Sequence, residues 1–214
     1  MAATGIHLPP RSRPWGLIVL LAVLAAAGLW FVGHNVLHYV QFNEQTYGPF
    51  WPRRFGLALH IVGGLTALSV GIVQIWLGLT GRTRGQHPVL GRVYVCGILL
   101  GSAGGFYLAL TISSQFSSYA AGLFMLCVAW LVTTGTAIVA VRRHDYEQHR
   151  EWMIRSYTVT FAFVTFRLFA DWLVALHVPS RVEISTTMAW ACWAVPLLIA
   201  EPLLQLRRMR MRRP

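Results

Sequence analysis

The chain has 214 residues, of which 56% are hydrophobic and only 12% are charged, and its mean hydropathy is +0.54. A soluble domain carries about 25% charged residues, so this composition excludes an ordinary soluble enzyme and indicates an integral membrane protein. The formal net charge of +11 does not point to nucleic acid, because the arginines stand beside apolar runs, as in proteins whose partner is the lipid bilayer.

Six apolar stretches are long enough to cross a bilayer, which takes about 20 residues each. In chain order they cover residues 15–38, 56–79, 93–112, 119–141, 153–176 and 184–206. Short connections favour antiparallel neighbours in one compact bundle. The sequence therefore predicts an all-α integral membrane protein. We expect a single six-transmembrane-helix domain over residues 15–206, an N-terminal tail at 1–14 and a basic tail at 207–214.

The first stretch has two interpretations. Arg11 and Arg13, followed by an apolar run that contains three alanines at 25–27, resemble a secretory signal peptide with its small-residue cleavage site. The run continues through Val32, which is long for a signal core. This length favours an uncleaved first helix.

The distribution of arginines predicts the orientation. If the N-terminus is cytoplasmic, 14 arginines fall on that side, and only Arg53, Arg54 and Arg181 fall on the other. Basic residues collect on the cytoplasmic side of membrane proteins. We therefore expect both termini in the cytoplasm and a multi-pass protein of the bacterial inner membrane.

Small residues recur four apart in the third stretch, at Gly97, Gly101 and Gly105. A stripe of glycines on one helix face lets a neighbouring helix approach closely. This pattern indicates helix packing rather than catalysis, and the sequence assigns no catalytic residue.

Several ionisable residues fall in the half of the bundle away from the termini. His34 and His38 share one helix face, and Arg167 and Asp171 are likewise four residues apart. At about 1.5 Å of rise per residue, His60, His38 and Asp171 reach similar depths. Arg167 and Asp171 are expected to form an intrahelical ion pair, or to bind an anionic group and orient a histidine. His60 is either a core histidine bonded to a carbonyl group or a ligand.

A second pattern occurs twice, each time where a cytoplasmic connection enters a span. A histidine is followed five or six residues later by an arginine, and two residues further by a tyrosine. The two copies are His87, Arg92 and Tyr94, and then His149, Arg155 and Tyr157. Each helix start favours an anion, whereas simple anchoring at the membrane interface is the alternative.

Glu201 lies between Pro196 and Pro202 near the end of the last span, and five arginines follow it. A salt bridge to these arginines is the first expectation, and a proton relay is the alternative.

These motifs, with Gly63, Gly64, Gln74 and Thr165, resemble the DUF2306 group of predicted bacterial membrane proteins over residues 60–201. The resemblance implies that six positions matter: His60, His87, Arg92, His149, Arg155 and Arg167. Pro88 departs from the group, which often has arginine there. The resemblance implies no activity.

The leading hypothesis is a transmembrane redox protein that binds haem b between histidines of different helices. The outer ligands would be His60 with His38 or His34, and the inner ligands His87 with His149. Arginines such as Arg92, Arg155 and Arg167 would neutralise the propionates. No cluster in the sequence predicts a metal site built from protein side chains alone.

Two alternatives belong to different classes. One is a non-catalytic membrane subunit whose basic motifs hold lipid headgroups, a membrane protein partner or a second copy of the chain. The other is a small transporter with Arg167 and Asp171 in its pathway. Retention of haem would separate the first hypothesis from both.

Overall fold

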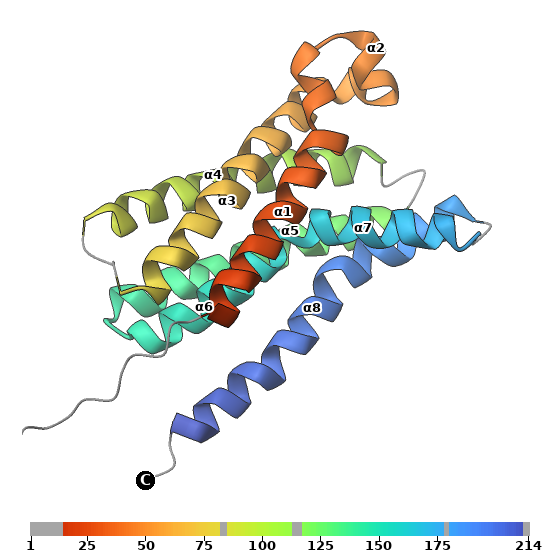
Figure 1. The fold of residues 1–214 in the computed structure, drawn as a ribbon. Helices are drawn as coiled ribbons and strands as arrows, with labels where there is room; N and C mark the ends of the chain where they lie inside the picture. Colours follow the sequence, from red (N-terminus) through yellow and green to blue (C-terminus); the bar gives the residue numbers. More distant parts are fainter. Residues whose placement is uncertain (1–14, 82–84, 113–116, 178–179, 212–214) are drawn as a thin grey trace, which may run out of the picture.

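The computed structural model describes residues 15–81, 85–112, 117–177 and 180–211. These residues form helices joined by short turns, with no strand among them (Figure 1). The elements are α1 (Trp15–Asn35), the 3-10 helix η1 (Leu37–Gln41), α2 (Glu44–Tyr47), the 3-10 helix η2 (Gly48–Arg53), α3 (Arg54–Leu79), α4 (Gln86–Ile112), α5 (Ser117–Arg142), α6 (Tyr146–Thr160), α7 (Ala162–Ala175) and α8 (Arg181–Met211).

The helices have the length and composition of membrane spans. Five of them qualify individually, and the bent pair of α6 and α7 supplies a sixth if the two halves count as one span. The outer surface is apolar, since side chains such as Leu29 and Leu198 are 74% and 70% exposed. These findings confirm an all-α, multi-pass membrane protein. The count of six spans and the cytoplasmic position of both termini stay predictions.

The fifth predicted span differs from the structure. Residues 153–176 do not form one straight helix, because α6 and α7 meet at Phe161 with a bend of 42°. The first half also begins earlier than expected, at Tyr146. The side chain of Asp145 accepts a hydrogen bond from the backbone N–H of Gln148 at 3.0 Å, which caps the helix at this point.

The connection after the first helix is also more ordered than a plain loop. The segment between α1 and α3 contains η1, α2 and η2, and α3 begins at Arg54. Asn43 caps α2, because its side chain accepts a hydrogen bond from the backbone N–H of Thr46 at 2.9 Å. The buried ring of Tyr47 packs edge-on against Tyr39 and Trp51, so aromatic contacts hold these short helices together.

Glycines bring α3 and α4 into direct backbone contact. A β-carbon placed on Gly63 would lie 2.2 Å from the backbone nitrogen of Gly101 and 2.5 Å from the carbonyl oxygen of Gly97. A β-carbon on Gly104 would meet the carbonyl of Gly56 at 2.5 Å. The predicted packing role of the glycine stripe is therefore confirmed.

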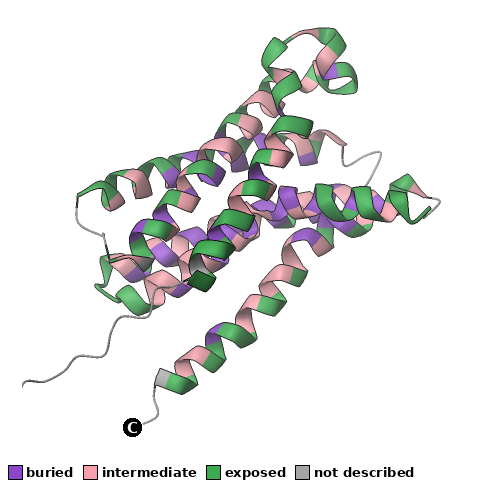
Figure 2. Ribbon diagram, in the orientation of Figure 1, coloured by how far each residue is buried: buried purple, intermediate pink, exposed green. Residues whose placement is uncertain are grey.

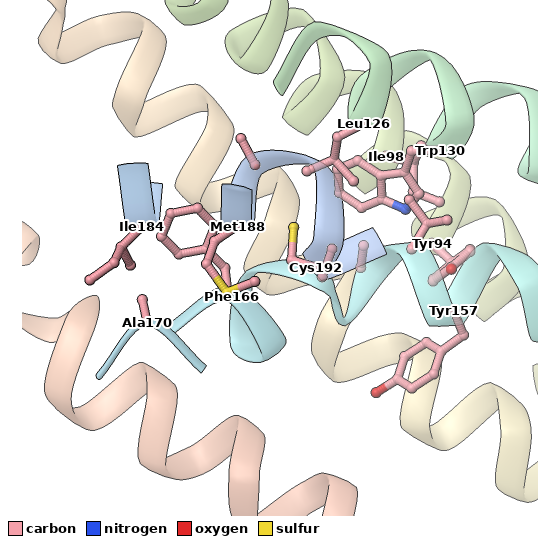
Figure 3. Packing of buried hydrophobic residues seen from close by; sticks show 14 residues of the cluster. Tyr94, Ile98, Leu126, Trp130, Tyr157, Phe166, Ala170, Ile184, Met188 and Cys192 are labelled. Carbon is pink, nitrogen blue, oxygen red and sulfur yellow. The ribbon is translucent and has the colours of Figure 1, made fainter. Parts of the chain in front are cut away.

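The most buried residues lie where α3 to α8 meet (Figure 2). Figure 3 shows the centre of this cluster, in which Tyr94 and Ile98 of α4 face Leu126 and Trp130 of α5. Met188 and Cys192 bring α8 into the same core.

The two predicted tails have different outcomes. Residues 1–14, with Arg11 and Arg13, lie outside the described residues, as do Arg82, Arg84, Arg212 and Arg213. In the second tail, α8 continues as a helix as far as Met211.

Candidate functional site at the arginine-rich end

The two histidine–arginine–tyrosine motifs meet at one end of the bundle. His87 lies in the first turn of α4 and His149 in the first turn of α6, close enough for their charges to interact. Tyr94 and Tyr157 converge deeper in the bundle, since a β-carbon on Gly71 of α3 would touch both rings, at 3.1 and 2.3 Å. We call this end of the molecule, which also carries Arg92, Arg150, Arg155, Arg207 and Arg208, the arginine-rich end.

The arginines of the two motifs have different environments. Arg92 is exposed on α4. Arg155 is buried, with 10% of its side chain exposed, and donates hydrogen bonds from Nε and Nη2 to Oε2 of Glu201 on α8, at 2.9 and 2.6 Å. The two motifs are therefore alike in sequence, but their arginines have different structural roles.

A second ion pair links the same two helices, with the acid on α6 and the arginine on α8. Arg208 of α8 donates from Nε to Oε1 of Glu151 on α6 at 2.6 Å, and from Nη2 to the other carboxylate oxygen. Glu151 is almost fully buried, at 1% exposure, and also lies 3.8 Å from Nη1 of Arg155. The two guanidinium groups are needed to neutralise this buried carboxylate, because a buried charge left without a partner is strongly destabilising.

The prediction of the partner of Glu201 was wrong. The sequence predicts a salt bridge to the arginines that follow it, but its partner is Arg155 of α6, and the following Arg208 pairs with Glu151 instead. Glu201 and Arg208 are seven residues apart on α8, so they share a helix face that lies along α6. The side-chain amide of Gln205 adds a hydrogen bond to Oε1 of Glu201 at 2.8 Å.

A shallow, open cavity of about 410 Å³ lies beside this network, between α5, α6 and α8. Its lining residues are Thr133 of α5, Trp152 and Arg155 of α6, and Trp193, Ala194, Leu197, Leu198 and Glu201 of α8. We call this cavity the α8 groove. Its wall is apolar and aromatic, whereas its polar groups are mainly those of Arg155 and Glu201.

One donor of the Arg155 guanidinium group is enclosed by the protein. Nη1 of Arg155 is buried and has no hydrogen-bond partner among the described residues. The same guanidinium stacks on the indole of Trp152, with its central carbon 4.6 Å from the ring centroid. Nη1 lies 3.8 Å from Oε2 of Glu151 and is enclosed by the protein, so a ligand in the α8 groove would meet other atoms of the guanidinium.

Near His87, two more buried atoms have no hydrogen-bond partner in the part of the chain that the structure describes. Gln74 of α3 donates from Nε2 to the backbone carbonyl of His87 at 2.9 Å, but its Oε1 accepts nothing. Nδ1 of His87 is also unpaired. Nδ1 of His149, in contrast, is 2.9 Å from the carbonyl oxygen of Ala137.

The histidines predicted for an outer site have other surroundings. Nδ1 of His60 lies 2.7 Å from the carbonyl oxygen of Gly101, and its ring packs edge-on against Phe163. His38 is exposed in η1 beside Tyr39, with ring centroids 4.0 Å apart. His34 is exposed on α1, with Nδ1 3.0 Å from a carbonyl of the same helix.

Arg167 and Asp171 both lie on α7 with exposed side chains. The ion pairs among the described residues join Glu151, Arg155, Glu201 and Arg208, and none joins Arg167 to Asp171. Arg167 lies near Tyr119 at the start of α5, close enough for an electrostatic interaction.

Sequence reasoning missed a buried hydroxyl network at the junction of α4, α5 and α6. The hydroxyl of Tyr94 is 2.9 Å from that of Ser156 and 2.8 Å from that of Thr160. Ser156 continues to Thr134 at 2.7 Å, and the indole of Trp130 donates to Thr160 at 2.8 Å. Isolated hydroxyl residues in apolar spans carry no local signal of such a network.

No group of three or more histidine, cysteine or acidic residues that could hold a metal ion occurs within the described ranges. All three cysteines, Cys96, Cys127 and Cys192, are free.

Comparison with known protein families gives one match. The family model described as predicted membrane protein, DUF2306, matches residues 57–204. The chain belongs to the DUF2306 family. The matched region of this DUF2306 protein extends from α3 into the second half of α8 and so includes both ion pairs except for Arg208. Searches of the curated proteins and of the solved structures find no match to the chain.

Proposed function

We propose that this DUF2306 protein is a membrane-embedded lipid-binding protein, whose α8 groove holds one chain of a phospholipid with the headgroup against Arg155 and Glu201. The observation that carries the proposal is a guanidinium, that of Arg155, paired with a half-exposed carboxylate, that of Glu201, at the polar end of an otherwise apolar groove. The α8 groove has a volume of about 410 Å³ and is open along one side, not enclosed.

The apolar wall of the α8 groove suits an acyl chain but does not select one lipid over another. Trp152 and Trp193 present flat indoles, and Leu197 and Leu198 extend the surface along α8. An acyl chain that leaves the bilayer for this wall gains little hydrophobic free energy, because lipid tails are as apolar as leucine. Selectivity must therefore come from the polar end of the α8 groove.

The charges at the polar end favour a zwitterionic headgroup. A phosphate oxygen can accept from the buried guanidinium of Arg155. A primary ammonium can donate to Glu201, whose side chain is 46% exposed beside the groove. An anionic lipid without an ammonium would meet Glu201 unfavourably, so phosphatidylethanolamine fits best.

The proposed orientation determines which leaflet of the membrane the α8 groove opens to. If both termini are cytoplasmic, the groove opens to the inner leaflet of the bacterial inner membrane. The surrounding arginines would then face the anionic surface of that leaflet, which attracts basic residues.

Native mass spectrometry of the protein extracted in mild detergent tests this function. We expect one retained phosphatidylethanolamine per chain, and its loss in Ala194→Trp, which fills the groove from α8. Leu203→Trp is the matched control, because Leu203 is a 62% exposed residue of the same helix outside the groove. Equal lipid retention by both variants, or none by the unsubstituted protein, would contradict the proposal.

Haem b is a second candidate, since His87 and His149 both lie in first turns of helices, α4 and α6, at the arginine-rich end. The contact of Nδ1 of His149 with the Ala137 carbonyl would leave Nε2 for iron, as second-shell contacts do in haem and metal sites. Exposed Arg92 could pair with a propionate. No histidine lines the α8 groove, however, so that cavity gives haem no support.

The haem candidate has a direct optical test. Protein purified from haem-supplemented cells should show b-type bands in a reduced-minus-oxidised spectrum, and His149→Ala should remove them. A flat spectrum from folded protein excludes haem at His87 and His149, whatever the outcome of the lipid experiment.

A further inference from the structure

A second feature, independent of the α8 groove, lies on the exposed face of α7. Arg167 and Asp171 are one helical turn apart and exposed on the same face. Leu168 and Val174, 40% and 38% exposed, flank them on the helix surface. Arg167 is eight residues from the end of α7 at Ala175, which places it about 12 Å inside that end.

Neither charge has a partner among the described residues of one copy. No hydrogen bond and no ion pair to Arg167 or Asp171 is found among the described residues, and the neighbour of Arg167 is the phenol of Tyr119. Ionisable residues within a span almost always face the bundle interior and pair with one another. An exposed cation and an exposed anion on one face of α7 therefore indicate a missing protein surface.

We propose that this face of α7 is the contact between two copies of the chain, with Arg167 of each copy bound to Asp171 of the other. A surface that binds both Arg167 and Asp171 must carry an anion and a cation one helical turn apart. The α7 helix of a second copy carries this pair. Both copies have the same arginine distribution and thus the same orientation in the membrane, so their α7 helices run parallel. A two-fold axis along the membrane normal makes both ion pairs equivalent.

The geometry suits parallel helices. Four residues of helix rise about 6 Å, and an extended arginine side chain covers a similar distance. Arg167 can therefore reach along the partner helix to Asp171. Leu168 and Val174 would pack beside the two ion pairs, which excludes lipid and strengthens them.

Charge reversal in the full-length chain tests the interface. Two differently tagged copies are expressed together, and their co-purification in mild detergent is measured. Arg167→Asp and Asp171→Arg should each reduce self-association by about tenfold or more, because like charges then face each other. Arg181→Asp is the control, since Arg181 is an exposed arginine of α8 and not of α7.

Mixed pairings separate a true interface from misfolding. The two single variants should co-purify with each other although neither does so with itself. The chain that carries both substitutions should pair with itself and not with the unsubstituted chain. A monomeric unsubstituted protein, single variants that associate normally, or failure of every mixed pairing overturns the proposal. So does capture of a different protein by this face in place of a second copy.

Discussion

Arg155 of α6 donates two hydrogen bonds to a single carboxylate oxygen of Glu201 on α8, at 2.9 and 2.6 Å. The same two helices are joined again by Glu151 of α6 and Arg208 of α8. Each helix thus contributes one acid and one base. This reciprocal arrangement fixes the second half of α8 to α6 and forms the polar end of the α8 groove.

Loss of the buried carboxylate should destabilise this attachment. Glu151→Gln removes the charge between Arg155 and Arg208, at a cost on the order of 3 kcal/mol, as for one partner of a buried pair. We expect a lower unfolding temperature in detergent, measured by tryptophan fluorescence. Glu183→Gln, at an exposed position on α8, should leave the temperature unchanged. Equal effects would mean that the buried network does not stabilise the fold.

Adjacent glycines on α3 provide a matched test of the helix contact. In Gly63→Ala, the new methyl group would collide with the backbone of Gly101, so α3 and α4 must separate, at about 1–3 kcal/mol. In Gly64→Ala, no atom lies within 4 Å of the new methyl group, and no destabilisation is expected. The comparison of the two unfolding temperatures checks this prediction, and a destabilised Gly64→Ala would contradict the packing of α3.

The hydroxyl network should contribute to stability near the bend between α6 and α7. Tyr94→Phe removes the hydrogen bonds to Ser156 and Thr160, which lowers the free energy of unfolding by about 1–2 kcal/mol. Tyr107→Phe on the same helix is the control, because Tyr107 is 46% exposed. Chemical denaturation of both variants measures the difference, and indistinguishable midpoints would show that the network is not stabilising.

The predicted orientation can be read from reporter fusions. A fluorescent protein that matures only in the cytoplasm, fused after residue 214, should fluoresce. The same reporter inserted at residue 180, in the connection between α7 and α8, should stay dark. The opposite pattern would show that the arginine-rich end faces away from the cytoplasm.

The sequence predicts the helical membrane fold well, because spans and glycine stripes are local patterns. Gly97 and Gly101 identify the packing face of α4 even when the partner helix is not known. The partner of Arg155 could not be predicted, since Glu201 is 46 residues away and the tail arginines are nearer in sequence. The exposure of Arg167 could not be predicted either. Spacing shows which residues share a helix face, but it does not show whether that face is buried or exposed.

A structure determined by electron cryomicroscopy in lipid nanodiscs that contain phosphatidylethanolamine tests the lipid-binding proposal most directly. We predict elongated density in the α8 groove, between Trp152 and Trp193, with its polar end within hydrogen-bond distance of Arg155 and Glu201. A well-resolved α8 groove that holds no lipid, or that α8 closes by packing directly on α6, would contradict the proposed function.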